Sequence, residues 1–234
     1  MSEKLLELFK SSTIENSDIL RNLPLFTSRI DLADMMFMIE LYKKSMNTHG
    51  VIAEFGSRWG RNLALFTTLR SILEPYNHIR KIIGFDTFSG FAEVSKEDGE
   101  YSGVSKGGFS VSANYENYLE EVIQAHEDMA PVSAKKKFEL VKGDILETLP
   151  EYLKDHPETI FSLVYIDVDL YGPTKKILEL IKPHLVKGSI IGFDELCHPN
   201  WPGETIALSE EIGLSNVALR RLPYSPTTSY LVVE

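Results

Sequence analysis

The stretch VIAEFGSRWGRNLALF, residues Val51 to Phe66, decides the fold of this chain. It opens with a short apolar run that suits a buried strand, passes through a turn containing two glycines, and ends in apolar residues at helical spacing. A strand, a tight glycine turn and a helix form the opening unit of a nucleotide-binding α/β fold. We therefore expect an α/β protein with a ligand site at the end of this first strand.

The turn has the pattern E-x-G-x-x-x-G, formed by Glu54, Gly56 and Gly60. It differs from the dinucleotide fingerprint because Arg58 stands where a second glycine would be. The glycines let the backbone approach a ligand, and the helix that follows offers free N–H groups. An acid at Glu54 favours a cationic ligand such as S-adenosylmethionine over a pyrophosphate. The alternative is an ordinary strand–helix turn without a ligand.

Composition and charge narrow the class of protein. The 234 residues allow one domain or two small ones, and the 43% of hydrophobic residues is ordinary for a globular protein. A net charge of -10 and no basic run longer than Lys135–Lys137 argue against a nucleic-acid partner. Cys197 is the single cysteine, which favours a reducing compartment. With no apolar run of membrane-spanning length and no signal-peptide pattern, we expect a cytoplasmic protein without a membrane partner.

Strand and helix patterns alternate along the chain. The helix beginning near Pro173 is expected to run to about Leu185 and to end at Gly188. The last two β-like runs are Val217–Arg221 and Ser229–Val233. Their connection is too short for a crossover, so we expect them to form an antiparallel pair. The sequence therefore predicts an α/β three-layer sandwich, a Rossmann-like, mostly parallel sheet with a C-terminal antiparallel hairpin. The strands after the first are expected at Lys81–Phe85, Phe138–Val141, Phe161–Asp167, Ser189–Phe193, Val217–Arg221 and Ser229–Val233.

We expect three parts in the chain. Residues 1–50 form an N-terminal helical extension packed on the core, and residues 51–234 form the main domain. Within the latter, residues 87–113 are rich in glycine, serine and charge and show no periodicity. A long irregular segment after a binding strand is usually a lid or substrate loop, and disorder is the alternative.

Acidic residues end three of the expected strands. Asp86 closes the second strand, where a carboxylate can accept hydrogen bonds from both hydroxyls of a ribose. Asp167 and Asp169 follow the most apolar strand, and Asp194 and Glu195 follow the next. Carboxylates converging at one edge of a parallel sheet repel unless they are protonated or bind a cation. An all-oxygen set suits Mg²⁺, Ca²⁺ or Mn²⁺, and the alternative is that these acids are helix caps or solvated turn residues.

A set of motifs carries a resemblance to a known family. The motifs are Glu54-x-Gly56-x-x-x-Gly60, Asp86-Thr-Phe-Ser-Gly90-Phe91, Gly143 with Thr148-Leu149-Pro150, Ile166-Asp167-Val-Asp169-Leu-Tyr171, and Asp194-Glu195. With them, roughly Gly50 to Gly213 resembles the macrocin O-methyltransferase family. Its members are class I, S-adenosylmethionine-dependent and divalent-metal-dependent enzymes, which methylate sugar hydroxyls in natural product biosynthesis. The specific part is the D-x-D-L-Y stretch followed by a paired acid.

The resemblance implies roles for the acids. Asp167, Asp194 and Glu195 are expected to hold Mg²⁺ or another hard divalent cation, with Asp169 as the general base. The family usually has two aspartates where this chain has Asp194-Glu195, so it stays open whether Glu195 binds the metal directly or through water. His198 is a rival base because its ordinary pKa lies near neutrality, or else it is a solvated loop histidine. The residues expected to bind S-adenosylmethionine are Glu54, Gly56, Ser57, Gly60, Asp86, Ser89, Gly143, Asp144 and Asp167.

The expected function is the transfer of a methyl group to a small-molecule acceptor, a sugar or glycosylated metabolite. The first alternative is a metal-dependent O-methyltransferase of a catechol-like phenol, because a catechol presents the same pair of oxygens as a vicinal diol. The second is a non-catalytic adenosyl-ligand binding protein. The sequence leaves open the acceptor, the hydroxyl that is methylated and whether the chain forms a homo-oligomer.

Overall fold

A single mixed sheet forms the centre of the molecule. The computed structural model describes residues 3–101 and 104–234. The strand order is β3-β2-β1-β4-β5-β6, and every neighbouring pair is parallel except β5 and β6, which are antiparallel. The predicted fold class is therefore confirmed. The strands are β1 (Val51–Phe55), β2 (Ile82–Asp86), β3 (Phe138–Lys142), β4 (Phe161–Ile166), β5 (Leu185–Phe193) and β6 (Ser229–Val232).

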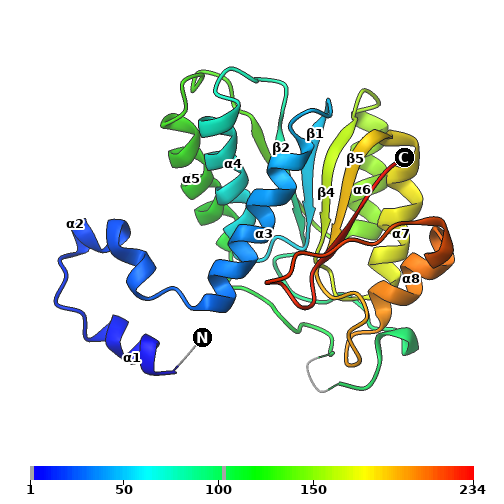
Figure 1. Cartoon of the computed structure of the whole chain (residues 1–234), viewed down its shortest axis with the longest axis horizontal. Helices are drawn as coiled ribbons and strands as arrows, with labels where there is room; N and C mark the ends of the chain where they lie inside the picture. The colour runs from blue at the N-terminus through cyan, green and yellow to red at the C-terminus, as the bar shows by residue number, and fades with distance from the viewer. Residues whose placement is uncertain (1–2, 102–103) are drawn as a thin grey trace.

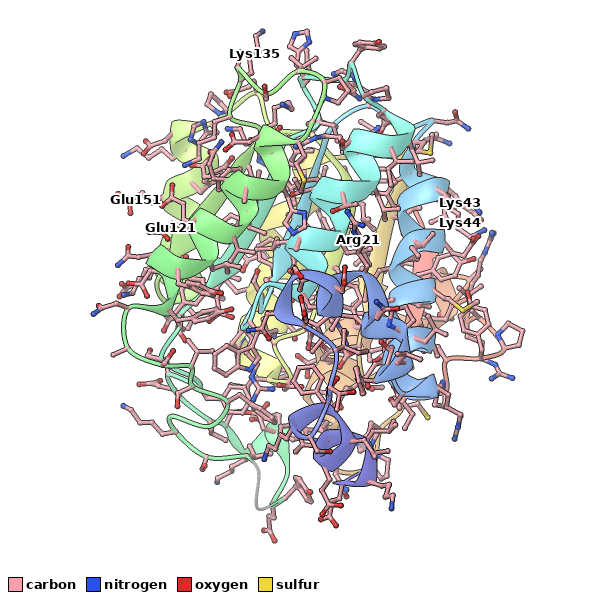
Figure 2. All side chains as sticks on the ribbon, turned by 90° about the vertical axis from the view of Figure 1, so that its left-hand side faces the viewer. Arg21, Lys43, Lys44, Glu121, Lys135 and Glu151 are labelled. Carbon is pink, nitrogen blue, oxygen red and sulfur yellow. The ribbon has the colours of Figure 1, made fainter. Side chains whose placement is uncertain are left out.

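Helices cover both faces of the sheet, which gives the predicted three layers (Figure 1). One face is covered by α3 (Arg29–Ser45), α4 (Arg61–Leu73) and α5 (Tyr115–Asp128), which lie side by side in Figure 2. The other is covered by α6 (Ile145–Asp155), α7 (Tyr171–Ile181) and α8 (Gly203–Glu211). Apolar side chains fill both spaces between helices and sheet. Within the described ranges, no helix combines the length and apolar character needed to cross a membrane.

The apolar character of β4 follows from its central position. It lies between β1 and β5, and all of its residues are buried. Parallel strands with helices on both faces read as continuous apolar runs, which is why this strand stood out in the sequence. The first acid after it, Asp167, is therefore placed at the middle of the sheet edge.

The N-terminal 50 residues divide into two parts. In α3, the side chains of Phe37, Leu41 and Tyr42 are buried against the sheet. By contrast, α1 (Glu3–Lys10), α2 (Asn16–Ile19) and the 3₁₀ helix η1 (Leu20–Leu25) bury no residue and project from the body of the molecule (Figure 1). Among the described residues of this extension, α3 and the segment that follows it are integrated into the core, with Thr48 also buried.

Two boundaries differ from those predicted. The helix near Pro173 begins at Tyr171 and ends at Ile181, followed by the short 3₁₀ helix η3 (Lys182–His184). Gly188 therefore lies within β5, where its φ of 92° interrupts the strand geometry and its carbonyl accepts from the Thr48 hydroxyl at 2.9 Å. The prediction that Gly188 ends the helix is wrong, because the chain turns into β5 earlier.

The C-terminal antiparallel element also has a different partner. Residues 217–221 form no strand, and only Arg220 makes an antiparallel bridge to Tyr230. The strand β6 pairs instead with β5, from Ile190↔Val232 to Phe193↔Ser229. This pairing buries Tyr230 and Leu231, whereas Arg220 is exposed. Tyr230 therefore pairs with Gly192 of β5 on one side and with Arg220 on the other, and the predicted antiparallel pair is reduced to this single bridge.

Candidate active site

A cavity of about 480 Å³ opens at the carboxyl edge of the sheet. Its wall is built by the ends of β1 to β5, by the segment that follows β2, and by the N-terminal parts of α3 and α4. The carboxyl edge is where α/β folds bind ligands. Of the residues predicted from the sequence, this wall contains Gly56, Asp86, Gly143, Asp144, Asp167, Asp169, Asp194 and Glu195.

The remaining predicted residues do not line this cavity: they are Glu54, Ser57, Gly60, Ser89 and His198. Ser57 is buried, and Ser89 is exposed with its N–H donating to the Thr87 hydroxyl at 3.1 Å. His198 is half-buried, and its Nδ1 accepts from the Asn200 N–H at 3.3 Å.

The two glycines of the first turn are required by the packing of the protein itself. Gly56 has a φ of 93°, and a Cβ there would lie 1.8 Å from the carbonyl oxygen of Asp167. Gly60 has a φ of 75°, and its Cβ would lie 2.2 Å from Leu119 Cδ1 on α5. Gly56 still borders the cavity, whereas the space beside Gly60 is filled by a side chain.

Glu54 and Asp86 end neighbouring strands. Glu54 is 2% exposed, and its Oε1 accepts from Asn62 Nδ2 at 2.7 Å while its buried Oε2 has no partner in the described part of the chain. Burial raises the pKa of Glu54 to about 8. Asp86 lines the cavity and accepts from the N–H groups of Arg58 at 2.7 Å and Phe88 at 2.5 Å. These bonds fix the orientation of the Asp86 carboxylate.

Three aspartates form a compact carboxylate cluster. Asp167, Asp169 and Asp194 each place a carboxylate oxygen within 4.8 Å of the others. Burial, followed by the charge of Asp194, raises the pKa of Asp169 to about 7 and holds that of Asp167 well above its ordinary value. Burial also raises the pKa of Asp194. Three mutually repelling oxygens at this spacing are the arrangement that a hard divalent cation would stabilise.

Glu195 borders the cavity but is not part of the carboxylate cluster. Burial and the charges of Asp169 and Asp194 raise its pKa to about 8. The sequence assigned Glu195 to the metal and Asp169 to proton transfer, whereas the structure brings Asp169 together with Asp167 and Asp194. Asp169 can therefore be a ligand, a base, or both in turn.

The position of Asp169 depends on an unusual turn. Its φ is 60°, and the Leu170 N–H donates to the Val168 carbonyl at 2.6 Å, which closes a three-residue turn. Turns of this kind are rare and strained for a residue with a side chain. Such strain persists where the surrounding structure enforces it, and functional sites are the common location.

Two residues that the sequence analysis missed support the carboxylate cluster. The Tyr165 hydroxyl donates to Asp194 Oδ1 at 2.8 Å. Glu204 on α8 is fully buried, and its Oε2 accepts from the Glu195 N–H at 3.3 Å. A signal existed for Tyr165, because residues two apart on a strand share a face and Tyr165 precedes Asp167 by two.

The cavity wall also contains two cations that the sequence analysis did not assign. They are Arg58 and Arg61, the positively charged side chains among the described lining residues. The Arg58 guanidinium lies 4.8 Å from the centre of the Phe109 ring, and Arg61 Nη1 lies 3.8 Å from Asp34 Oδ2. They place positive charge in a wall otherwise rich in acids.

Comparison with known proteins identifies the class. Residues 53–196 match the model of a methyltransferase domain family, and the chain belongs to that family. The match runs from β1 to just beyond Glu195, so it covers the predicted site residues except His198 and includes all three acids of the carboxylate cluster.

Solved structures refine the assignment. CalS11, a calicheamicin methyltransferase, is 44% identical, with 98% of this chain and 90% of that chain covered and a TM-score of 0.96. An apo structure of CalS11, described as a TDP-rhamnose 3'-O-methyltransferase of calicheamicin biosynthesis, is 42% identical, covers 98% and 91%, and has a TM-score of 0.87. NovP, at 14% identity, 86% and 80% coverage and a TM-score of 0.65, shows the fold alone. No curated protein matches the chain.

These findings confirm the predicted enzyme class, an S-adenosylmethionine-dependent O-methyltransferase, and the resemblance on which it rested.

Proposed function

We propose that this enzyme methylates a hydroxyl of a nucleotide-linked deoxysugar of the TDP-rhamnose type. The observation that carries the proposal is the 42% identity over 98% of the chain to an enzyme that acts on TDP-rhamnose. The carboxylate cluster at the cavity supports it, because a hard cation held by these acids could also bind two neighbouring hydroxyl oxygens of a sugar.

The cofactor would occupy the β1–β3 side of the cavity. Asp86 would accept hydrogen bonds from the ribose hydroxyls, and the observation that it lines the cavity together with Gly143 and Asp144 supports this assignment. The unpartnered Oε2 of Glu54 fits an ammonium group, since a buried carboxylate oxygen without a donor is costly. We therefore assign Glu54 to the amino acid end of S-adenosylmethionine.

The carboxylate cluster fits a hard divalent cation such as Mg²⁺. Asp167, Asp169 and Asp194 offer oxygen ligands alone, which selects this class of ion over zinc. Once bound, the ion would supply positive charge that lowers the pKa of an acceptor hydroxyl. Glu195, beside the cluster, would join it directly or through water.

An acidic side chain at the cavity would accept the proton that the acceptor hydroxyl loses. Asp169 borders the cavity beside the carboxylate cluster, and we assign it to accept the proton of the acceptor hydroxyl. Glu195 borders the same space and is the next acceptor in reach. His198 does not border the cavity, so we assign the proton transfer to Asp169 first.

The arginines of the wall suggest how a nucleotide sugar would be held. A diphosphate carries negative charge that the acids of the cavity would repel, and Arg58 and Arg61 are the cations placed to receive it. A free sugar or a catechol has no such group. We therefore assign the arginines to the diphosphate of the acceptor.

The test is a methyl-transfer assay analysed by mass spectrometry. The enzyme is given S-adenosylmethionine with TDP-rhamnose, the free sugar, or a catechol, each with Mg²⁺ and with excess chelator. The proposal expects methylated TDP-rhamnose as the main product. Preference for the catechol would favour the phenol alternative, and cofactor binding without product from any acceptor would favour a non-catalytic binding protein.

A further inference from the structure

An acid in the segment after β2 reaches across the site to the start of α7. Asp98 belongs to the short 3₁₀ helix η2 (Lys96–Asp98), at the lower edge of the molecule in Figure 1. Its side chain is 1% exposed, and its Oδ1 accepts from the Tyr171 N–H at 2.5 Å. Burying a carboxylate is costly unless hydrogen bonds compensate for the lost water, so we expect this contact to have a structural role.

The N–H that Asp98 accepts from is an unpaired group of a helix end. Tyr171 is the first residue of α7, and the preceding Leu170 supplies no side-chain cap. The first N–H groups of a helix have no partner within it, and a carboxylate is the favoured acceptor. Asp98 therefore caps α7 from another part of the chain.

The surroundings of Asp98 are shaped to hold it there. A Cβ on Gly203 would lie 2.6 Å from the Tyr171 nitrogen, 2.7 Å from Asp98 Oδ1 and 3.2 Å from the Asp169 carbonyl oxygen. The second oxygen of Asp98 accepts from the Ser95 N–H at 2.6 Å and the Ser95 hydroxyl at 2.8 Å. Both oxygens are thus engaged, and α8 leaves room for the contact only because residue 203 has no side chain.

The contact lies next to the strained turn at Asp169. Tyr171 follows Asp169 by two residues, and the turn from Val168 to Leu170 lies directly before the capped N–H. On its other side the turn is fixed by β4, which ends at Ile166. The two ends of the strained segment are therefore held by the central strand and by Asp98.

We propose that Asp98 is a positioning residue that holds the Asp169 turn in the geometry that completes the carboxylate cluster. The segment after β2 and the arrangement of the catalytic acids are thereby coupled: the cluster is complete when Asp98 is seated at the start of α7. The expected effect on kcat rests on the proposed function, whereas the expected effect on the position of Asp169 does not.

The same segment makes a second contact with the loop before α8. Phe91 and Phe109, which line the cavity, pack with Tyr101 around Trp201, with ring centres 5.7–6.3 Å from the Trp201 ring. Trp201 is 6% exposed. This aromatic contact holds the segment near the start of α7, where the Asp98 carboxylate accepts the hydrogen bond from the Tyr171 N–H.

The experiment compares Asp98→Ala with Asp98→Asn and with Glu97→Gln, an exposed neighbour in the same 3₁₀ helix. Asp98→Ala is expected to lower kcat between about tenfold and a hundredfold, because catalytic groups tolerate little displacement. The KM for S-adenosylmethionine should change little, since Asp98 lies on the α7 and α8 side. Asp98→Asn keeps an oxygen that can accept from Tyr171 and should recover part of kcat, and Glu97→Gln should match the wild type.

Crystal structures of the same variants give a readout independent of activity. In Asp98→Ala the Asp169 side chain should leave the carboxylate cluster, while Asp167 and Asp194 stay in place. If Asp98→Ala does not fold, Ser95→Ala should shift Asp169 in the same direction to a smaller extent, because it removes the hydroxyl that holds Asp98 Oδ2 at 2.8 Å. An Asp169 that keeps its position in these variants, or equal kcat in Asp98→Ala and Glu97→Gln, overturns the proposal. An enzyme inactive on TDP-rhamnose with a displaced Asp169 in the variants would refute only the proposed acceptor.

Discussion

Asp167 is the residue at which the two sides of the site meet. Its backbone oxygen lies against Gly56 of the turn after β1, and its carboxylate belongs to the cluster with Asp169 and Asp194. A residue in this position links the place where the methyl donor would lie to the place where the acceptor would lie. The acids around it carry raised pKa values, so their protonation affects both stability and chemistry.

Glu54 gives a test of stability against pH. Burial raises its pKa from 4.5 to about 8, so the metal-free, ligand-free protein loses stability as the pH rises through that window. A tenfold change in a protonation equilibrium is worth about 1.4 kcal/mol, so the loss in the free energy of unfolding is on the order of a few kcal/mol. In urea titrations, Glu54→Gln should therefore gain stability over the wild type at pH 8 relative to pH 5.

The matched control is Glu151→Gln, an exposed acid on α6 that is labelled in Figure 2. Its difference from the wild type should not change with pH. The prediction is contradicted if the free energy of unfolding changes by the same amount between pH 5 and pH 8 in the wild type and in Glu54→Gln. That result would show that Glu54 is charged in the folded state.

Arg61 gives a test of acceptor binding. If it holds the diphosphate, Arg61→Gln should raise the KM for TDP-rhamnose about tenfold or more, since a charge-assisted hydrogen bond is worth about 1.5–3 kcal/mol. The KM for S-adenosylmethionine should stay within twofold. Arg21→Gln, in η1 and labelled in Figure 2, is the matched control. The reverse pattern would mean that Arg61 binds the carboxylate of the cofactor instead.

At the scale of elements, the ends of the strands position the acids of the site, and residues of the segment after β2 line the same cavity. The ends of parallel strands bring Asp86, Asp167 and Asp194 to one edge, whatever the loops between them contain. Residues of the segment 87–113, whose role as a lid remains our proposal, cover that edge through Phe91 and Phe109. We propose that the sheet forms the base of the site and that the segment after β2 is a cover joined to it by a few contacts.

Hydrogen exchange tests that division. Trp201→Ala removes the ring around which Phe91, Tyr101 and Phe109 pack, and each aromatic pair contributes about 0.5–1.5 kcal/mol beyond the buried area. Amides of residues 88–101 and 104–113 should exchange about tenfold faster or more in the variant, while those of β1 and β4 stay unchanged. Equal exchange in the two proteins would show that the cover does not depend on this contact.

The elements were predictable to the extent that local pattern decides them. The buried strand at Phe161 follows from its continuous apolar run, because a strand with neighbours on both sides and helices on both faces buries every residue. Gly188 was misassigned because glycine ends helices and also interrupts strands, and only the contact with Thr48 shows which applies. Residues 217–221 have a strand-like composition, yet their pairing with β6 is limited to the bridge from Arg220 to Tyr230, and β6 pairs along its length with β5, which is distant in the sequence.

The site was predictable where residues follow strands and unpredictable where the fold brings distant segments together. The convergence of Asp167 and Asp194 follows from topology alone. Glu204 and Asp34 carry no local signal, because their positions depend on α8 and α3 packing at the sheet edge. Asp98 completes a capping box with Ser95, but that pattern does not indicate the contact with Tyr171. The departure of Glu195 from the cluster reflects side-chain geometry after β5, which no motif specifies.

At the scale of the whole molecule, the chain is an S-adenosylmethionine-dependent O-methyltransferase with a proposed nucleotide-sugar acceptor. Its net charge of -10 includes the acids of the carboxylate cluster at the cavity. These carboxylates repel one another unless a cation or bound protons balance their charge. Metal dependence is therefore the property on which the proposed chemistry depends most.

The most direct test measures methyl transfer from S-adenosylmethionine to TDP-rhamnose for the wild type, Asp167→Asn and the control Glu151→Gln, with Mg²⁺ and with excess chelator. We expect Mg²⁺-dependent methylation by the wild type and Glu151→Gln. Asp167→Asn should lose at least about a hundredfold in rate, while calorimetry shows the cofactor still bound. Full activity of the wild type in chelator, or an Asp167→Asn variant as active as the control, would contradict the account.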